Sequence, residues 1–156
     1  MKRTLLDTGP LVALVDSSEA HHPWARQQFA SVSPPLYTCE AVIAECVYLL
    51  AGASVDATAP LDLISRGVLQ IDFHLAAEHA AVRDLLARYA PRMDLADACL
   101  VRMSELNRES QVLTLDADFR IYRRNGRHVV PTILPDVPLP RASGRRRGPT
   151  ARRRRS

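Results

Sequence analysis

Short runs of β-branched and aliphatic residues alternate with longer helical runs along this chain, and that alternation limits its fold more than any other feature. Strands are expected over 4–7, 36–39, 68–71 and 111–115, with a probable edge strand over 128–133 that Pro131 interrupts. Helices are expected over 8–15, 22–32, 41–50, 75–89 and 94–106, with shorter ones ending over 62–66 and covering 119–124. This order predicts an α/β fold with a mostly parallel sheet flanked by helices.

Length and composition indicate one soluble globular unit. A chain of 156 residues that is 47% apolar has the size and composition of a single domain. Its apolar runs all fall well short of the roughly 20 residues of a membrane span. The short apolar segment after Met1 has no small-residue cleavage site. We therefore expect a cytoplasmic protein that has no membrane partner.

The cysteines and histidines do not form a recognisable metal or disulfide pattern. Cys39, Cys46 and Cys99 lie in apolar surroundings without a C-x-x-C pair, so they are expected to be small core residues. The five histidines, which include the adjacent His21 and His22, lack the spacing of a zinc site. They are expected in surface loops or at helix caps.

Charge is distributed unevenly along the chain. The net charge is +4, but the residues after Asp136 contain no acid and eight arginines, so residues 1–136 carry a net charge of −4. This composition predicts a folded domain over 1–136 and a disordered tail over 137–156, because the tail has little to bury. Basic runs commonly bind nucleic acid, although a solvated appendage is an equal alternative. The candidate nucleic-acid-binding residues are Arg145, Arg146, Arg147, Arg152, Arg153, Arg154 and Arg155.

Four carboxylates interrupt apolar runs in which a purely structural interpretation would place no charge: Asp7, Glu45, Asp97 and Asp116. Charged side chains are rarely buried unless they are paired or bind a metal. Asp7 and Asp116 follow expected strands, where open parallel sheets bind their ligands. The other two lie on apolar helices that could point toward the same strand ends.

Each acid also has a simpler structural interpretation. Asp7 or Thr8 could cap the following helix, and Asp94 with Asp97 has the spacing of a capping pair. Asp116 and Asp118 could be turn residues. Glu45 is the hardest to explain in this way, because its helix offers few other polar positions.

A shared divalent cation explains why the acids would gather. Two carboxylates about 4 Å apart repel each other by about 4 kcal/mol at an effective dielectric constant of about 20. Oxygen ligands without histidine or cysteine favour Mg²⁺ or Mn²⁺ over Zn²⁺. Such an ion activates water and stabilises charge on a phosphodiester, so these acids predict metal-assisted hydrolysis of a nucleic acid.

Four motifs together resemble the PIN-domain family, and in particular the VapC-like ribonuclease toxins of bacterial toxin–antitoxin pairs. They are LLDTGPLVALVD, TCEAVIAEC, MDLADACLVRMSEL and VLTLDADF, and the resemblance covers about residues 4–134. It implies a three-layer α/β/α sandwich and Mg²⁺- or Mn²⁺-dependent RNA cleavage. It also implies inhibition by a cognate antitoxin, and a homodimer. The arginine tail departs from the family pattern.

The resemblance also assigns expected roles to the acids. Asp7 and Asp97 would be the principal metal ligands, and Glu45 and Asp116 would complete the catalytic site directly or through water. Asp94 stays open between ligand, helix cap and outer support. The other candidates for outer support, through hydrogen bonds to the ligands or proximity to the motif, are Thr8, Thr114 and Asp118.

Other functional classes remain as alternatives at this point. A haloacid-dehalogenase-like phosphatase needs a D-x-D pair after the first strand and a downstream lysine, whereas this chain has D-T-G and only Lys2. A non-catalytic nucleic-acid-binding module would depend on the tail and need no metal. A housekeeping RNA-processing nuclease of the same fold would share every site residue.

Overall fold

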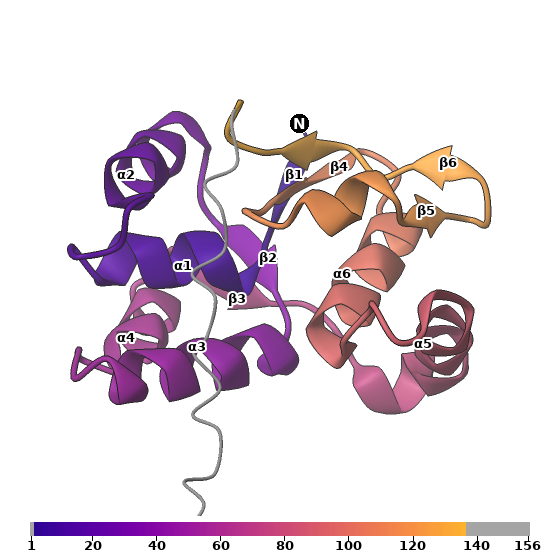
Figure 1. Cartoon of the computed structure of the whole chain (residues 1–156), viewed down its shortest axis with the longest axis horizontal. Helices are drawn as coiled ribbons and strands as arrows, with labels where there is room; N and C mark the ends of the chain where they lie inside the picture. Colours follow the sequence, from indigo (N-terminus) through magenta and orange to yellow (C-terminus); the bar gives the residue numbers. More distant parts are fainter. Residues whose placement is uncertain (1, 137–156) are drawn as a thin grey trace, which may run out of the picture.

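The computed structural model describes residues 2–136, which build a five-stranded parallel sheet with the order β3-β2-β1-β4-β7 (Figure 1). Each strand pairs in parallel with its neighbours, and Leu5 of β1 lies opposite Tyr37 of β2 and Val112 of β4. The strands are β1 (Arg3–Leu6), β2 (Leu36–Thr38), β3 (Leu69–Ile71), β4 (Ser110–Leu113) and β7 (Thr132–Ile133).

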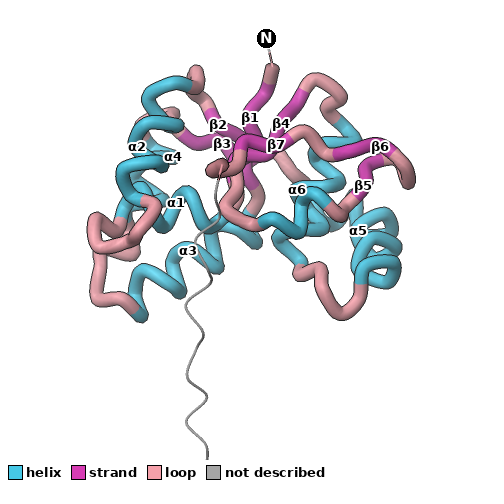
Figure 2. The backbone as a smooth tube through the Cα atoms, turned by 45° about the horizontal axis from the view of Figure 1, so that its top comes forward, coloured by secondary structure: helices cyan, strands magenta, loops and turns pink. Residues whose placement is uncertain are grey.

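Helices cover both faces of this sheet because its central strands are apolar on both sides. In β1, Leu5 belongs to one buried core and Leu6 to the other, as the alternation of side chains along a strand requires. Figure 2 shows the corresponding two groups of helices. They are α1 (Thr8–Val15), α2 (His22–Ser31), α3 (Glu40–Gly52) and α4 (Ala59–Ser65) on one side, and α5 (Leu75–Tyr89) and α6 (Leu95–Leu106) on the other. The predicted three-layer α/β/α sandwich is confirmed.

One sequence-based expectation near the end of the domain was wrong. The predicted helix over 119–124 is a 3-10 helix, η1 (Ala117–Arg120), followed by a two-stranded antiparallel ribbon of β5 (Arg123–Arg124) and β6 (His128–Val129). Asn125 and Gly126 have positive φ angles of 51° and 77°, the turn geometry that an Asn-Gly pair favours. The Asn125-Gly126 pair, rather than the helical pattern, therefore determines the local structure here.

The expected edge strand over 128–133 is divided at Pro131. Proline has no backbone N–H to donate to a sheet, and the Pro131 carbonyl instead accepts a 2.8 Å hydrogen bond from the N–H of Val112. Residues before it join β5 in the small ribbon, and residues after it form β7 at the edge of the main sheet.

Further expectations concern the cysteines, the histidines, membrane-spanning helices and the tail. The three cysteines are buried and free, as predicted. His21 and His74 occupy the N-cap positions of α2 and α5, which also agrees with the sequence. Among residues 2–136, no helix has the length and apolarity needed to cross a bilayer. The predictions for the tail over 137–156, including its arginines, lie outside the described residues.

Candidate active site

The site begins where the two central strands end. β1 and β4 are parallel and in register at Leu6 and Leu113, so the residues that follow them lie side by side. Thr114, directly after β4, donates a 2.6 Å hydrogen bond from its hydroxyl to Oδ2 of Asp7, directly after β1. The strand ends therefore place an acid and its hydrogen-bond donor together, as the topology predicts.

A pocket of about 510 Å³ opens beside these strand ends. Its walls come from α1, α3, α6, the loop before α2 and the segment after β4. Six acidic side chains line it, and five of them come from the four segments that the sequence singles out: Asp7, Glu45, Asp94, Asp97 and Asp116. The sixth is Glu19. All four of the principal predicted acids thus share one pocket, although their roles as ligands stay predictions.

Asp7 is held in place by donors on both of its carboxylate oxygens. Oδ1 accepts a 2.7 Å hydrogen bond from the backbone N–H of Thr8, and Oδ2 accepts the bond from Thr114. Burial, together with the smaller effects of the nearby charges of Asp116 and Glu45, nevertheless raises the pKa of Asp7 from 3.8 to about 6. The pocket therefore places Asp7 where a compensating positive charge would be favourable.

Asp97 is buried and faces the same pocket from the first turn of α6. Burial raises its pKa from 3.8 to about 7, with the charges of Asp94 and Asp7 as the next causes. Tyr122 donates a 3.0 Å hydrogen bond to Oδ2 of Asp97, which partly offsets this effect. Two buried carboxyl groups in one pocket thus titrate near neutral pH, a pattern typical of functional sites.

Glu45 reaches the pocket from the middle of α3. Its Oε2 accepts a 2.7 Å hydrogen bond from the Thr8 hydroxyl, so Thr8 joins α1 to α3 at the site. Burial raises the pKa of Glu45, and the charge of Asp94 adds to the shift. The predicted contacts of Thr8 and Thr114 with acidic side chains are therefore present.

Asp116 and Asp118 differ in their relation to the pocket. Asp116 lines it, donates its backbone N–H to the Thr114 hydroxyl at 2.9 Å, and accepts the Asp118 N–H at Oδ1 at 2.9 Å. The Asp118 side chain instead forms a 2.9 Å ion pair with Arg92. Asp118 thus supports Asp116 through its backbone, while its carboxylate belongs to the neighbouring surface.

The helix-capping interpretations are also correct, and they coexist with the clustering. Asp7 caps α1, Asp116 caps η1, and Asp94 caps α6 in a reciprocal capping box with Asp97. Helix N-termini carry partial positive charge, which stabilises carboxylates at these positions. Capping therefore helps to hold Asp7, Asp94, Asp97 and Asp116 in place.

The chemistry of these donors fits a hard divalent cation. The pocket is lined by carboxylate and threonine oxygens, the ligand type that Mg²⁺ and Mn²⁺ prefer, and the pKa shifts of Asp7 and Asp97 indicate uncompensated negative charge. Among residues 2–136, however, no three acidic, histidine or cysteine side chains already stand close enough together to hold an ion.

Three contributors to the pocket were missed by sequence reasoning. Tyr122 was expected on a short helix, and only the structure shows its hydroxyl on Asp97. Glu19 and His21 line the pocket from the loop between α1 and α2. The sequence carries no spacing signal for them, because a loop rather than a periodic element brings them there.

Comparisons with known proteins identify the family and the fold of the chain. The PIN domain family model matches residues 4–125. The crystal structure of VapC20 from Mycobacterium tuberculosis, described as a toxin that cleaves the sarcin–ricin loop, is similar, with a TM-score of 0.67 and 22% sequence identity over 82% of this chain and 99% of that chain. A search of curated proteins found no match. Since the family match spans most of the chain and contains all five clustered acids, this protein belongs to the PIN domain family.

Proposed function

We propose that this protein is a metal-dependent ribonuclease and the toxin of a toxin–antitoxin pair. The observation that carries the proposal is the convergence of acids from four segments on one pocket, with Asp7 and Asp97 buried there. The family match and the fold shared with the VapC20 toxin support RNA as the substrate.

The residues of the pocket have different proposed roles in the reaction. Asp7 and Asp97 would hold Mg²⁺ or Mn²⁺, with Glu45 and Asp116 completing the site directly or through water. A bound ion would supply positive charge to the scissile phosphate and lower the pKa of the attacking water. Thr8 and Thr114 orient Glu45 and Asp7 through hydrogen bonds of 2.7 and 2.6 Å. Asp94 fixes the start of α6 and therefore the position of Asp97.

Positive charge for an RNA strand follows Asp116 in the chain. The residues between Asp118 and Asp136 include four arginines and no acid, in a domain whose net charge is negative. The guanidinium groups of Arg123 and Arg124 donate hydrogen bonds to backbone carbonyl oxygens. Arg120 and Arg127 are exposed, and they are the residues we assign to phosphate contacts.

The tail is proposed to add further phosphate contacts. Each phosphate neutralised on a single strand contributes about 0.7 to the log–log dependence of binding on salt. Truncation after Asp136 removes eight arginines and should reduce that slope by up to about five. If truncation leaves the salt dependence of binding to single-stranded RNA unchanged, the tail does not contact the phosphates.

A cognate antitoxin, a homodimeric state and a cytoplasmic location follow from the toxin assignment. All three proposals depend on the family resemblance. Co-expression tests the proposed antitoxin directly. We expect the chain to be toxic when it is expressed alone in bacteria, and a small protein encoded next to it to relieve that toxicity. Growth unaffected by the intact chain would favour an RNA-processing nuclease of the same fold.

Catalysis is tested with purified protein, a single-stranded RNA and added Mn²⁺. Wild-type protein should cleave the RNA, the chelator EDTA should abolish cleavage, and Asp7→Asn should lose it while keeping its thermal unfolding transition. Asp84→Asn is the matched control, because Asp84 is an exposed acid on α5 away from the pocket. Mn²⁺ binding by calorimetry separates this proposal from a non-catalytic RNA-binding module, which has no reason to bind the ion.

A further inference from the structure

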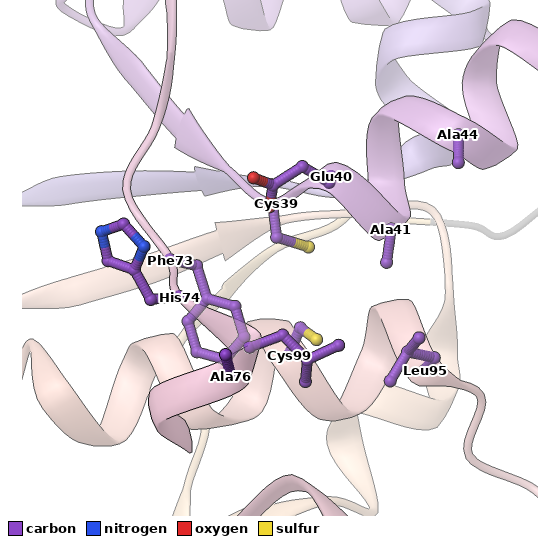
Figure 3. A pocket seen from close by; sticks show the side chains of 10 residues that line it. Cys39, Glu40, Ala41, Ala44, Phe73, His74, Ala76, Leu95 and Cys99 are labelled. Atoms are coloured by element: carbon purple, nitrogen blue, oxygen red, sulfur yellow. The ribbon is translucent and has the colours of Figure 1, made fainter. Parts of the chain in front are cut away.

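A second cavity, of about 500 Å³, lies between the start of α3, the start of α5 and α6 (Figure 3). Its lining is mainly apolar and includes Cys39 and Cys99, so we call it the thiol cavity. The acidic pocket, which holds the clustered acids, has nearly the same volume but an entirely different set of lining residues. The two cavities therefore allow a comparison within one molecule.

The acidic pocket changes in character along α1. At the start of this helix, Thr8 donates its hydroxyl to Glu45 of α3 among the clustered acids. One turn further along each helix, the pocket is lined by Val12 and Leu49 instead. Beyond the end of α1, the loop before α2 contributes His21. The pocket thus passes from carboxylates at the strand ends to apolar and aromatic side chains at the far end of α1.

The loop that carries His21 is fixed by its own hydrogen bonds. Oδ1 of Asp16 accepts hydrogen bonds from the backbone N–H and the hydroxyl of Ser18, at 2.9 and 2.6 Å. The neighbouring His22 donates a 2.7 Å hydrogen bond from Nδ1 to the carbonyl of Ala13, which joins the end of the loop to α1. The backbone on both sides of the loop is therefore held, and His21 faces the pocket from a fixed position.

The imidazole of His21 has the surroundings of a ligand-binding group. The residue occupies the N-cap position of α2, but its side chain makes no capping hydrogen bond. Trp24 contacts the imidazole edge-to-face, with ring centroids 6.3 Å apart and ring planes at 73°. In such an arrangement the indole covers at most one face of the imidazole. Trp24 therefore orients the ring without enclosing it.

The chemistry of this end of the pocket suits a nucleobase better than a phosphate. Glu19 of the same loop lines the pocket together with the clustered acids, so a phosphate beside His21 would meet negative charge. A base is uncharged and flat, and its face can pack against a ring and against side chains such as Val12 and Leu49. Histidine is one of the aromatic side chains on which unpaired RNA bases stack.

We propose that His21 is a substrate-binding residue, whose imidazole stacks on the base of the nucleotide next to the scissile phosphate. The inference rests on the proposed function, because the clustered acids are where that function places the scissile phosphate. A base reaches the ring only when it is unpaired and separated from its neighbours. His21 therefore selects unpaired nucleotides through the base, while the acids act on the phosphate.

The test measures binding of fluorescein-labelled oligouridylate by anisotropy, with Ca²⁺, which carboxylates also bind, in place of Mn²⁺. His21→Ala should weaken binding by about 5- to 100-fold, the effect of losing one base–aromatic stack. His21→Phe keeps an aromatic ring and should bind within about threefold of wild type, whereas His21→Gln keeps only hydrogen-bonding groups and should bind as weakly as His21→Ala. Pairing the probe with oligoadenylate should weaken binding to wild type and have little effect on His21→Ala.

His74→Ala is the matched control. His74 occupies the N-cap position of α5, also without a capping hydrogen bond, and it lines the thiol cavity rather than the acidic pocket. The variant should therefore bind the single-stranded probe as wild type does. Equal weakening in His21→Ala and His74→Ala would overturn the assignment.

A second measurement needs no substitution, so a variant that fails to fold does not affect it. Trp24 is the only tryptophan of the chain and contacts His21, so its fluorescence reports on this ring. Oligouridylate should change the emission of the wild-type chain, and a ribose–phosphate oligomer of the same length without bases should change it less. Constant emission while anisotropy shows bound oligouridylate would place the RNA elsewhere.

Two further outcomes would overturn the stacking role. These are wild-type binding by His21→Ala, and binding that glutamine preserves and phenylalanine does not, which would indicate a hydrogen bond instead. Because these measurements record binding, they separate this inference from the nuclease proposal. If the base stacks on His21 but wild type cleaves no RNA with Mn²⁺, the nuclease proposal fails and the base site stands. If His21→Ala cleaves with the kcat and KM of wild type, the nuclease proposal stands and the base site fails.

Discussion

Two pockets of nearly equal volume lie along the same pair of helices, and they differ in almost every chemical respect. The acidic pocket measures about 510 Å³ and the thiol cavity about 500 Å³, and both are lined by residues of α3 and α6. On α6, Asp97 faces the first, and Leu95 and Cys99 face the second, because residues two apart on a helix point in opposite directions. One helix therefore supplies charge to one pocket and apolar surface to the other.

The two pockets differ in how far the charge of their lining side chains is offset. The acidic pocket contains several like charges, which hydrogen bonds and helix N-termini offset only in part, so the pKa values of Asp7 and Asp97 rise. The thiol cavity contains mainly apolar atoms and two buried thiols. A cation would stabilise the first pocket, whereas the second requires no ion.

The largest expected effect is on catalysis. Asp97→Asn keeps the size of the side chain but removes its charge, so RNA cleavage with Mn²⁺ should fall by more than about 100-fold, since even residues that only support a metal ligand are worth about 10- to 100-fold. Cys39→Ser, an equally small change in the thiol cavity, should leave the cleavage rate within about threefold of wild type. Equal losses of cleavage rate in the two variants would show that catalysis does not depend specifically on the acidic pocket.

A second prediction concerns stability without metal. Burial favours the protonated forms of Asp7 and Asp97 in the folded chain, with pKa values of about 6 and 7, whereas in the unfolded chain both titrate near 3.8. Between about pH 4 and pH 7 the folded state therefore binds more protons, so its free energy of unfolding falls as pH rises. The contribution of Asp97 is of order 4 kcal/mol.

Thermal unfolding in EDTA measures this effect. The melting temperature should decrease from about pH 5 to pH 8, and Asp97→Asn should flatten the decrease. Adding Mn²⁺ at pH 8 should restore wild type and leave the variant largely unchanged, because the ion needs the carboxylate. A melting temperature that rises over this range in EDTA would contradict the account of buried, uncompensated acids.

The positions of these acids could be predicted from the sequence, but their environments could not. Asp7 and Asp116 followed recognisable strands, and Glu45 and Asp97 interrupted apolar helices, so topology alone indicated that they would meet. The contact of Tyr122 with Asp97 depends on the turn at Asn125 and Gly126, which redirects residues expected on a helix. The thiol cavity also escaped prediction, since Cys39 and Cys99 are 60 positions apart and lie in ordinary apolar segments.

Thr8→Val tests the support around the acidic pocket. Valine keeps the shape of threonine but cannot donate to Oε2 of Glu45, so Glu45 loses its 2.7 Å hydrogen bond. Cleavage should fall by about 10- to 100-fold, the range for residues that orient metal ligands. Thr58→Val is the matched control, because the Thr58 hydroxyl bonds only to exposed Asp56. Retained wild-type activity in Thr8→Val would mean that Glu45 does not depend on this orientation.

The smallest expected effect concerns the surface beside each pocket. Arg120 and Arg127 follow the acidic pocket in the chain, whereas the thiol cavity is lined by Glu40 and has no arginine. Replacing both arginines with glutamine should reduce the log–log salt slope of RNA binding, measured in EDTA, by about 1.4, or about 0.7 for each phosphate contact. The same double change at Arg26 and Arg66, exposed residues near α2 and α4, should leave the slope unchanged. Equal reductions from the two pairs would mean that RNA responds only to net charge, and the assignment of Arg120 and Arg127 to phosphate contacts would have to be abandoned.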